Sequence, residues 1–202
     1  MLRCDSADYF QQGSATYPKA CVFSEVIPHL TYTLDSDIRS VAFHIFTAQH
    51  HPNLTYPLLV PFGVPMPRDK RIPGQYIAGD PDAPGLHRIT PTLHPGEYKA
   101  NGEHKDGACY KRGPHRDEYF DTGLPVPPRT PDEQCDEYPF ASTLEGAAHP
   151  YWDFSVKAVP QPDNSIAGAR LANYYVDDRI LAWDPGLDRP DETNDRFYVE
   201  IK

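Results

Sequence analysis

The sequence lacks any long apolar run, and no stretch approaches the roughly 18 apolar residues of a membrane-spanning helix. We therefore predict no transmembrane segment. It also lacks a Gly-x-Ser-x-Gly motif, a phosphate-binding loop and a dinucleotide-binding fingerprint. Internal repeats and low-complexity tracts are missing as well, which excludes a repeat array. An apolar content of 39% and a charged content of 24% are typical of a globular protein.

Positive charge is scarce, because 19 Lys and Arg residues stand against 29 Asp and Glu, a formal net charge of −10. General nucleic-acid binding depends on cations that neutralise phosphates, so this balance argues against tight binding to DNA or RNA. A bound metal ion would add local positive charge that a residue count omits. A hydrolase also gains more from weak than from tight ground-state binding, so a nuclease is still compatible with the composition.

Cysteine is limited to Cys4, Cys21, Cys109 and Cys135, and no two of them form a Cys-x-x-Cys pair, which argues against a zinc ribbon. Three disulfide pairings are open. The simplest joins Cys4 to Cys21 and Cys109 to Cys135, closing loops of about 17 and 26 residues that would each contribute about 3 kcal/mol. Four free thiols are the alternative. The even count and loop-rich composition favour an oxidising compartment.

The N-terminus begins Met-Leu-Arg-Cys and continues with polar residues, so we expect no signal peptide within this sequence. If the protein is exported, we expect its signal or a larger upstream region to precede Met1.

Proline is abundant, with 23 residues, and fifteen of them lie between positions 52 and 131. A compact domain rarely contains an unstructured span of this length, so we expect short strands, turns or a functional loop there. Before this span, alternation over 27–33 predicts a strand. A helix should follow, capped by Asp35 or Ser36 and ending before His50. Its apolar positions recur at helical spacing: Ile38, Val41, Ala42, Ile45 and Phe46.

The C-terminal region shows clearer periodicity. Alternation of apolar and polar residues predicts a strand near 154–158 and a terminal strand over 197–201. Between them, Asp163 or Asn164 can cap a helix. One face of that helix is apolar and consists of Ala167, Leu171, Tyr174 and Tyr175.

Residues 135–146 read Cys-Asp-Glu-Tyr-Pro-Phe-Ala-Ser-Thr-Leu-Glu-Gly, with three acidic groups among aromatic and apolar residues. Half-buried carboxylates are costly unless a cation, a donor or a proton compensates them. The block therefore favours a site that binds a hard divalent cation or moves protons. The alternative is a strand that carries surface acids.

This block resembles the signature of the NucA/NucB-type deoxyribonucleases, which are small secreted bacterial endonucleases. Later blocks occur in the same order as in that family: Ser155 to Val159, Asp163-Asn164, Ala167-Gly168, Leu171, and Asp195 to Ile201. The resemblance covers roughly residues 109–202.

The resemblance implies an α+β fold with a ββα-metal nuclease core, similar to His-Me fingers, and a Pro-rich, disulfide-stapled N-terminal extension. Residues 1–108 would form the extension and residues 109–202 the nuclease domain. We expect the two to form one continuous globular unit, since no flexible Gly/Ser linker divides the chain.

The resemblance further implies a secreted endonuclease that hydrolyses DNA without strong sequence preference, leaves 5′-phosphate ends and depends on Mg²⁺ or Mn²⁺. Asp136 would be the general base in place of the usual histidine. Glu145 and Asn164 would complete the catalytic group. The metal would be held by Glu145, Asn164 and Asn173. Because neighbouring strand residues point to opposite faces, Asp136 and Glu137 should not both face the substrate unless the strand bulges.

Substrate contacts are expected from Lys157, Ser165 and Arg170 on the strand and helix that follow the acidic block. The family pattern tends to carry arginine after the Asp-Asn pair, and this chain has Ser165 there, a departure that puts one phosphate contact in doubt. Each of these helix residues has a purely structural alternative. Asn164 could only cap the helix, and Arg170 and Asn173 could lie on its solvated face.

Three alternatives stay open. His115, beside Glu118, is a second choice of base. The same nuclease could be the toxin tip of a larger secreted protein with an immunity partner. From a different class, the chain could be a noncatalytic, disulfide-stapled extracellular module that binds protein or polysaccharide through its 13 tyrosines. The remaining histidines are expected in packing or surface roles.

Overall fold

The computed structural model describes the whole chain except residues 1, 13–14, 17, 24, 81 and 188–194. The elements of the N-terminal half are β1 (Leu2–Asp5), β2 (Gln11–Gln12), β3 (Ala15–Thr16), β4 (Ala20–Phe23), β5 (His29–Tyr32), α1 (Arg39–His50) and the short 3₁₀ helix η1 (Pro52–Leu54). Those that follow are α2 (Pro95–Tyr110), β6 (Glu133–Tyr138), β7 (Ser155–Pro160), α3 (Gln161–Asp177) and β8 (Tyr198–Ile201). None of the described helices is both long enough and apolar enough to cross a lipid bilayer.

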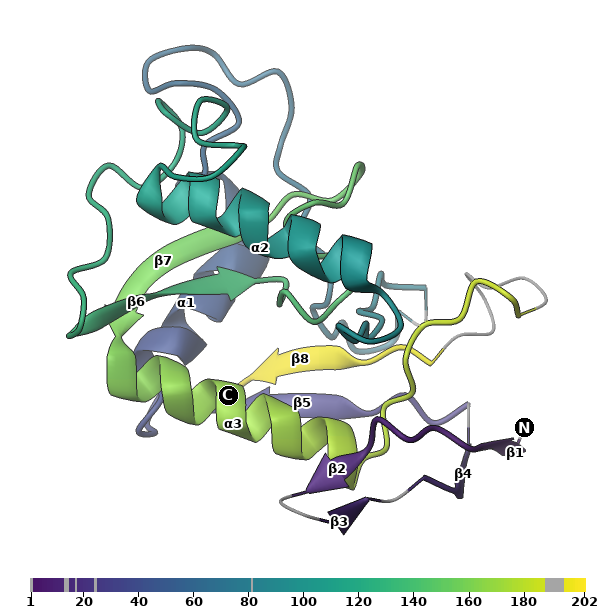
Figure 1. Cartoon of the computed structure of the whole chain (residues 1–202). Coiled ribbons are helices and arrows are strands. Elements are labelled where there is room, and N and C mark those ends of the chain that lie inside the picture. The colour runs from purple at the N-terminus through teal and green to yellow at the C-terminus, as the bar shows by residue number, and fades with distance from the viewer. Residues whose placement is uncertain (1, 13–14, 17, 24, 81, 188–194) are drawn as a thin grey trace.

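The described strands form four pairs, of which β5–β8 is parallel and β1–β4, β2–β3 and β6–β7 are antiparallel. The pairing of β5 with β8 brings residues 29–32 next to residues 198–201, so the two halves of the chain share a sheet (Figure 1). The division at residue 108 stays a prediction.

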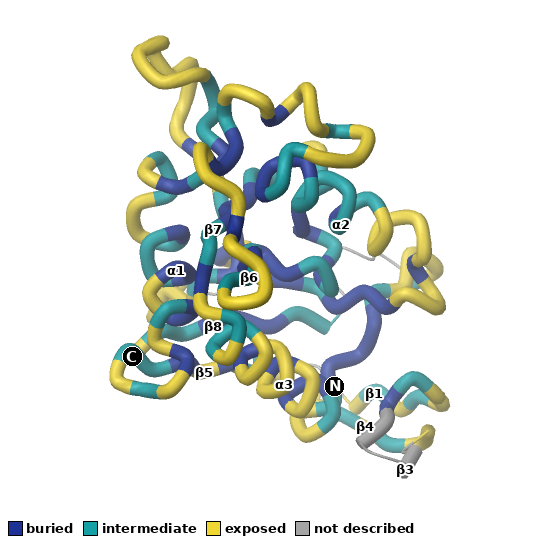
Figure 2. The backbone as a smooth tube through the Cα atoms, turned by 60° about the vertical axis from the view of Figure 1, so that its left-hand side comes forward, coloured by how far each residue is buried: buried dark blue, intermediate teal, exposed yellow. Residues whose placement is uncertain are grey.

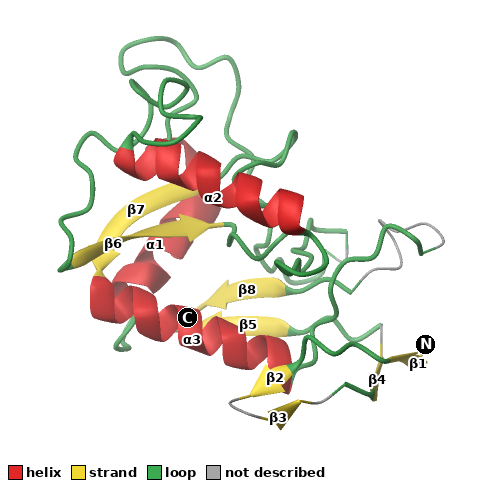
Figure 3. Ribbon diagram, in the orientation of Figure 1, coloured by secondary structure: helices red, strands yellow, loops and turns green. Residues whose placement is uncertain are grey.

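The pair β6–β7 carries helices on both faces (Figure 3). Tyr138 of β6 accepts a hydrogen bond from Gln49 of α1 at 2.9 Å, whereas Cys135, three residues earlier, is bonded to Cys109 of α2. Alternating side chains of a strand point to opposite faces, so α1 covers one face and α2 the other. Helix α3 follows β7 without a break and contacts β6.

Two apolar clusters form the core. Figure 2 shows which parts of the backbone are buried. The larger one lies between α1, α3 and the β5–β8 pair, and includes Ile45, Tyr174 and Phe197. The smaller one lies between α2 and β6–β7 around Cys109 and Cys135. The acidic block therefore lies between two packed regions, which accounts for the burial of its carboxylates.

The order strand, loop, strand, helix over 133–177 agrees with the prediction, but both helix starts differ from it. Helix α1 begins at Arg39, and Ser36 donates to the carbonyl oxygen of Thr33 instead of capping the helix. Helix α3 begins at Gln161 after Pro160, so Asp163 and Asn164 lie in its first turn and the predicted capping role is wrong. The Asp163 carboxylate instead accepts hydrogen bonds from Ser40 of α1.

Helix α2 was not predicted, since the region from 52 to 131 shows little apolar periodicity. Its buried residues are Asn101, Gly107, Ala108 and Cys109, a set with little apolar signal. Asn101 donates from its amide to the carbonyl oxygens of Ala141 and Thr143, both at 3.0 Å. A polar side chain on α2 thereby holds the loop of the acidic block in place.

The two disulfides are Cys4–Cys21 and Cys109–Cys135, and the described residues contain no free cysteine. This is the simplest of the three pairings open to the sequence. Cys4 and Cys21 are directly opposed in the β1–β4 pair. Cys109–Cys135 joins the end of α2 to β6, one residue before Asp136.

Candidate active site

A cavity of about 240 Å³ opens at the edge of β6 that is not paired with β7. Residues from β5, α1, α2, β6 and α3 meet there, so the cavity depends on contacts between distant parts of the chain. Its lining residues are Tyr32, Val41, Tyr98, Lys105, Cys135, Asp136, Glu137, Phe140, Ala141, Ser142, Asn164, Ala167, Gly168 and Leu171.

Asp136 lines this cavity although only 6% of the residue is exposed. Its Oδ2 accepts a hydrogen bond of 2.6 Å from Nδ1 of His44, which projects from α1 and is 2% exposed. The other ring nitrogen of His44 contacts the Ser155 hydroxyl at 2.7 Å. Since His44 engages Oδ2, Oδ1 is the carboxylate oxygen left for a further partner. A carboxylate fixed in this way can accept a proton from a bound water.

The row Ser155, His44, Asp136 has the connectivity of a serine-hydrolase triad, but its placement excludes that chemistry. Ser155 is completely buried, and neither Ser155 nor His44 lines the cavity. A nucleophilic hydroxyl has to reach a substrate atom, whereas this one points into the protein interior. Ser155 and His44 therefore position Asp136, which is the member of the row that meets the cavity.

Glu137 points away from α1, as the strand alternation predicts, yet it also lines the cavity. Both residues line the cavity because it lies at the strand edge; that only one of them faces a substrate stays a prediction. Glu137 Oε1 accepts from the backbone N–H of Ala141 at 2.8 Å. Its Oε2 is buried and has no hydrogen-bond partner among the described residues. Burial raises the pKa of Glu137 to about 7, against the opposing charge of Lys105.

This pKa predicts how the Glu137→Gln variant behaves in metal-free protein. The ordinary pKa of a glutamate carboxyl is 4.5, and that of Glu137 in the folded protein is about 7. Between these two pH values, Glu137 keeps its proton in the folded state but has lost it in the unfolded chain. The carboxyl therefore lowers stability as pH rises through that window. The glutamine variant lacks this loss, so its stability relative to wild type should increase by roughly 3 kcal/mol across the window, measured by urea unfolding.

Exposed Glu97 supplies the matched control, since Glu97→Gln should give a stability difference that does not vary over the same pH range. A flat profile for Glu137→Gln would show that Glu137 ionises normally in the folded protein.

Asn164 is the second predicted site residue that reaches the cavity. Its Nδ2 donates to Gln134 Oε1 at 3.0 Å, which leaves the amide oxygen as the atom that can face a cation or a water. Lys105 of α2 also lines the cavity and is the cation nearest to the acidic pair in its lining. Carboxylate, amide and ammonium groups thus converge on one edge of β6.

Glu145 lies elsewhere. It is buried, but His87 donates to it twice, from Nδ1 at 2.6 Å and from the backbone N–H at 2.8 Å. It does not line the cavity at the edge of β6. Asn173 is exposed on α3, nine residues and about 13 Å beyond Asn164 at 1.5 Å per residue. The structure therefore does not bring Glu145, Asn164 and Asn173 together around one ion.

The three predicted substrate contacts lie outside the cavity lining as well. Arg170 is exposed and paired with Asp37 at 2.6 Å. Ser165 is exposed and accepts from Gln161 at 2.8 Å. Lys157 is directly opposite Asp136 in the β6–β7 pair, with its ammonium 4.9 Å from the centre of the Phe43 ring. Of the three, only Lys157 lies on a strand that pairs with the acidic residues of β6.

Sequence reasoning missed His44 and Lys105. A signal for His44 exists, because it follows Val41 by three positions and precedes Ile45, so it falls within the buried stripe of α1. A histidine at such a position needs a polar partner, but the sequence does not show that the partner is Asp136. Lys105 lies on a helix without apolar periodicity, so no sequence signal placed it near the acidic block.

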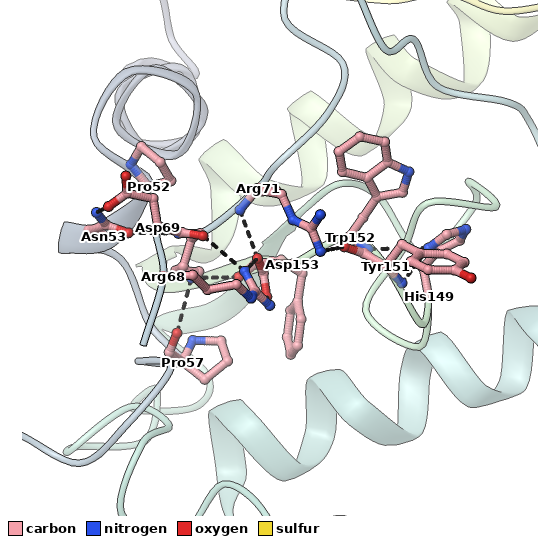
Figure 4. A network of polar contacts seen from close by, with 12 residues as sticks. Pro52, Asn53, Pro57, Arg68, Asp69, Arg71, His149, Tyr151, Trp152 and Asp153 are labelled. Carbon is pink, nitrogen blue, oxygen red and sulfur yellow. Dashed lines mark hydrogen bonds and ion pairs between the residues drawn. The ribbon is translucent and has the colours of Figure 1, made fainter. Parts of the chain in front are cut away.

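A second cavity, of about 420 Å³, lies on the α2 side of the molecule. Its wall includes Arg68, which binds Asp153 through two hydrogen bonds of 2.6 and 2.9 Å (Figure 4). The Arg71 backbone N–H also donates to Asp153. Arg68 and Asp153 therefore neutralise each other, and their hydrogen bonds join the loops around the cavity. His104 and Glu118 line the same cavity.

Comparison with known proteins gives one match. Residues 87–183 match the family model described as Deoxyribonuclease NucA/NucB. The match starts earlier than the resemblance at 109–202 and ends before β8. It includes α2, β6, β7 and α3, and hence Asp136, Glu137 and Asn164, but not His44. Neither the curated proteins nor the solved structures contain a match to this chain.

Proposed function

We propose, because residues 87–183 match the deoxyribonuclease NucA/NucB family, that this protein is an endonuclease that hydrolyses the phosphodiester bonds of DNA without strong sequence preference. The observation that carries the proposal is the carboxylate of Asp136, a residue of the family-matched segment, which His44 holds at the cavity beside β6. We place the active site in this cavity.

In this mechanism Asp136 accepts a proton from a water molecule as that water attacks the scissile phosphorus. The bond from phosphorus to the 3′ oxygen breaks, leaving a 5′-phosphate and a 3′-hydroxyl whose proton comes from solvent. His44 donates to Asp136 Oδ2 and so keeps Oδ1 directed at the water. It is a positioning residue, because it does not line the cavity. Lys105 is the proposed phosphate contact, since it is the cation in the lining.

A divalent metal ion fits the cavity on two observations. The Oε2 atom of Glu137 is buried without a hydrogen-bond partner among the described residues, and Asn164, whose amide nitrogen is already engaged by Gln134, belongs to the same lining. Both are hard oxygen donors of the kind that Mg²⁺ and Mn²⁺ prefer. We therefore assign the ion to Glu137 and Asn164, and drop Glu145 and Asn173 from the ligand set. When bound, such an ion stabilises developing negative charge on the phosphate and leaving oxygen.

Weak sequence preference follows if the contacts go to phosphates and not to base edges. The negative net charge of the chain also favours brief encounters with DNA over tight complexes. The two disulfides are consistent with a secreted protein. Secretion, a larger toxin protein and an immunity or inhibitor partner remain proposals.

The test is cleavage of supercoiled plasmid by purified, oxidised protein. We expect nicked and linear products with Mg²⁺ or Mn²⁺, none after EDTA, and recovery when excess metal is returned. Products should carry 5′-phosphates that support ligation without kinase treatment. Folded protein that leaves DNA intact under every metal would contradict the proposal and favour a noncatalytic binding module.

A further inference from the structure

His104, His115 and Glu118 form a second group of metal-capable side chains, separate from the proposed active site. One ligand atom from each lies within 4.8 Å of the others. His104 projects from α2, and the other two come from the turn segment that follows it. Nδ1 of His115 is 2.9 Å from Glu118 Oε2, and Nδ1 of His104 is 4.0 Å from the same oxygen. None of the three lines the cavity at the edge of β6.

We propose that these three residues bind Zn²⁺ or a similar borderline divalent cation. Two imidazoles and one carboxylate are a ligand set that zinc uses readily, whereas Mg²⁺ prefers oxygen. A tetrahedral zinc with bonds near 2.1 Å separates its ligand atoms by about 3.4 Å. The observed separations of 2.9 and 4.0 Å lie on either side of this value. Because the two imidazole rings are stacked, the partly exposed His115 ring has to turn before both rings direct a nitrogen at one ion.

The site is built by close backbone packing between α2 and the segment 113–124. A Cβ on Gly107 would lie 2.8 Å from the carbonyl oxygen of His115, so only glycine allows this approach. A Cβ on Gly123 would collide with the carbonyl oxygen of Ala108. The backbone N–H of Leu124 also donates to that oxygen at 2.8 Å. The three side chains therefore converge from two segments held in fixed register.

The ring of His104 makes two contacts that an ion would replace. Its Nδ1 lies 2.7 Å from the Tyr119 hydroxyl, and the ring stacks on His115 with centroids 3.5 Å apart. Nδ1 is also the His104 atom that lies 4.0 Å from Glu118 Oε2, so an ion bound through it replaces the Tyr119 contact. His104 and Glu118 also line the larger cavity, so an ion held by three protein ligands would keep one position open toward it.

This inference does not depend on the proposed nuclease function, and its readout is metal binding. The probe is Zn²⁺ titrated calorimetrically into untagged, EDTA-stripped protein, in excess Mg²⁺ that occupies oxygen-rich sites. We expect one strong site per chain, and a visible Co²⁺ spectrum of low-symmetry coordination. His115→Ala and Glu118→Gln, which change partly exposed residues, should each weaken Zn²⁺ binding by at least about tenfold, since second-sphere changes alone cost 10–100-fold.

The control is His51→Ala, which alters the exposed His50-His51 pair at the end of α1 and should leave Zn²⁺ affinity unchanged. As a second readout, Zn²⁺ should slow amide hydrogen exchange over 113–124 in wild type but not in His115→Ala. Absence of a strong site, or affinity lost in His51→Ala and kept in His115→Ala, would overturn the proposal. Circular dichroism of each variant separates loss of binding from loss of fold.

Discussion

Asp136→Asn is expected to lower the rate of plasmid cleavage by about 10²- to 10⁴-fold, the range for loss of a general base. Asparagine keeps the size of the side chain, and its amide oxygen can still accept the hydrogen bond from His44. The variant should therefore fold normally while it loses the charge that accepts the proton. Cleavage rates at saturating Mg²⁺ or Mn²⁺, together with thermal unfolding, separate the two effects.

The alanine variant adds a second result. Asp136→Ala leaves the buried His44 without its carboxylate hydrogen-bond partner, and a buried polar group left unsatisfied costs about 1–3 kcal/mol. We expect it to lose both activity and stability. Asp121→Asn, on an exposed loop, is the matched control and should change neither. If Asp136→Asn cleaves DNA at the wild-type rate, the base lies elsewhere, and His115 is the next residue to test.

Replacing Cys109 and Cys135 together by serine is expected to destabilise the protein by about 3–4 kcal/mol, the chain-entropy value for a 26-residue loop. This disulfide ties α2 to β6 within the smaller apolar cluster, adjacent to Asp136. Its loss should also reduce cleavage, because Cys135 itself lines the proposed active-site cavity. Denaturant unfolding and the plasmid assay measure the two quantities.

The Cys4–Cys21 disulfide provides the comparison. Its 17-residue loop gives a similar entropy, about 3 kcal/mol, but no residue of β1 or β4 lines the cavity. The double serine variant of this pair should lose stability while it retains the cleavage rate at temperatures where it is folded. Equal losses of activity in both double variants would contradict the structural link between Cys109–Cys135 and the site.

Much of the local structure could be predicted from the sequence. The strand near 154–158, the helix with Leu171 and Tyr174 on its buried face, and the terminal strand all exist close to the expected positions. Their periodicity is strong because each buries one side against the core. Helix α2 was missed for the opposite reason. Its buried contacts come from Asn101, Gly107 and Ala108, and its polar composition resembles that of a loop.

Some residues of the candidate site could also be predicted from the sequence, and others could not. Asp136 and Asn164 follow from short blocks of sequence, and both line the cavity. The resemblance groups Glu145 of the same acidic block with them, but His87 binds its carboxylate away from the cavity. Sequence proximity was misleading because the loop between them turns against α2, where Asn101 anchors it.

Composition and short-range pattern were sufficient to predict a chain of mixed helices and strands, the order β6–β7–α3 and a half-buried acidic block, and the resemblance of that block added the nuclease family. The tertiary structure decided the contacts between residues far apart in the chain. These are the hydrogen bond from His44 to Asp136, 92 positions away, the pairing of β5 with β8, and the His104–His115–Glu118 group. The difference has a physical cause. Periodicity records which side of each element is buried, whereas the partner of a buried polar group depends on which elements pack together, and that choice is made by the whole core.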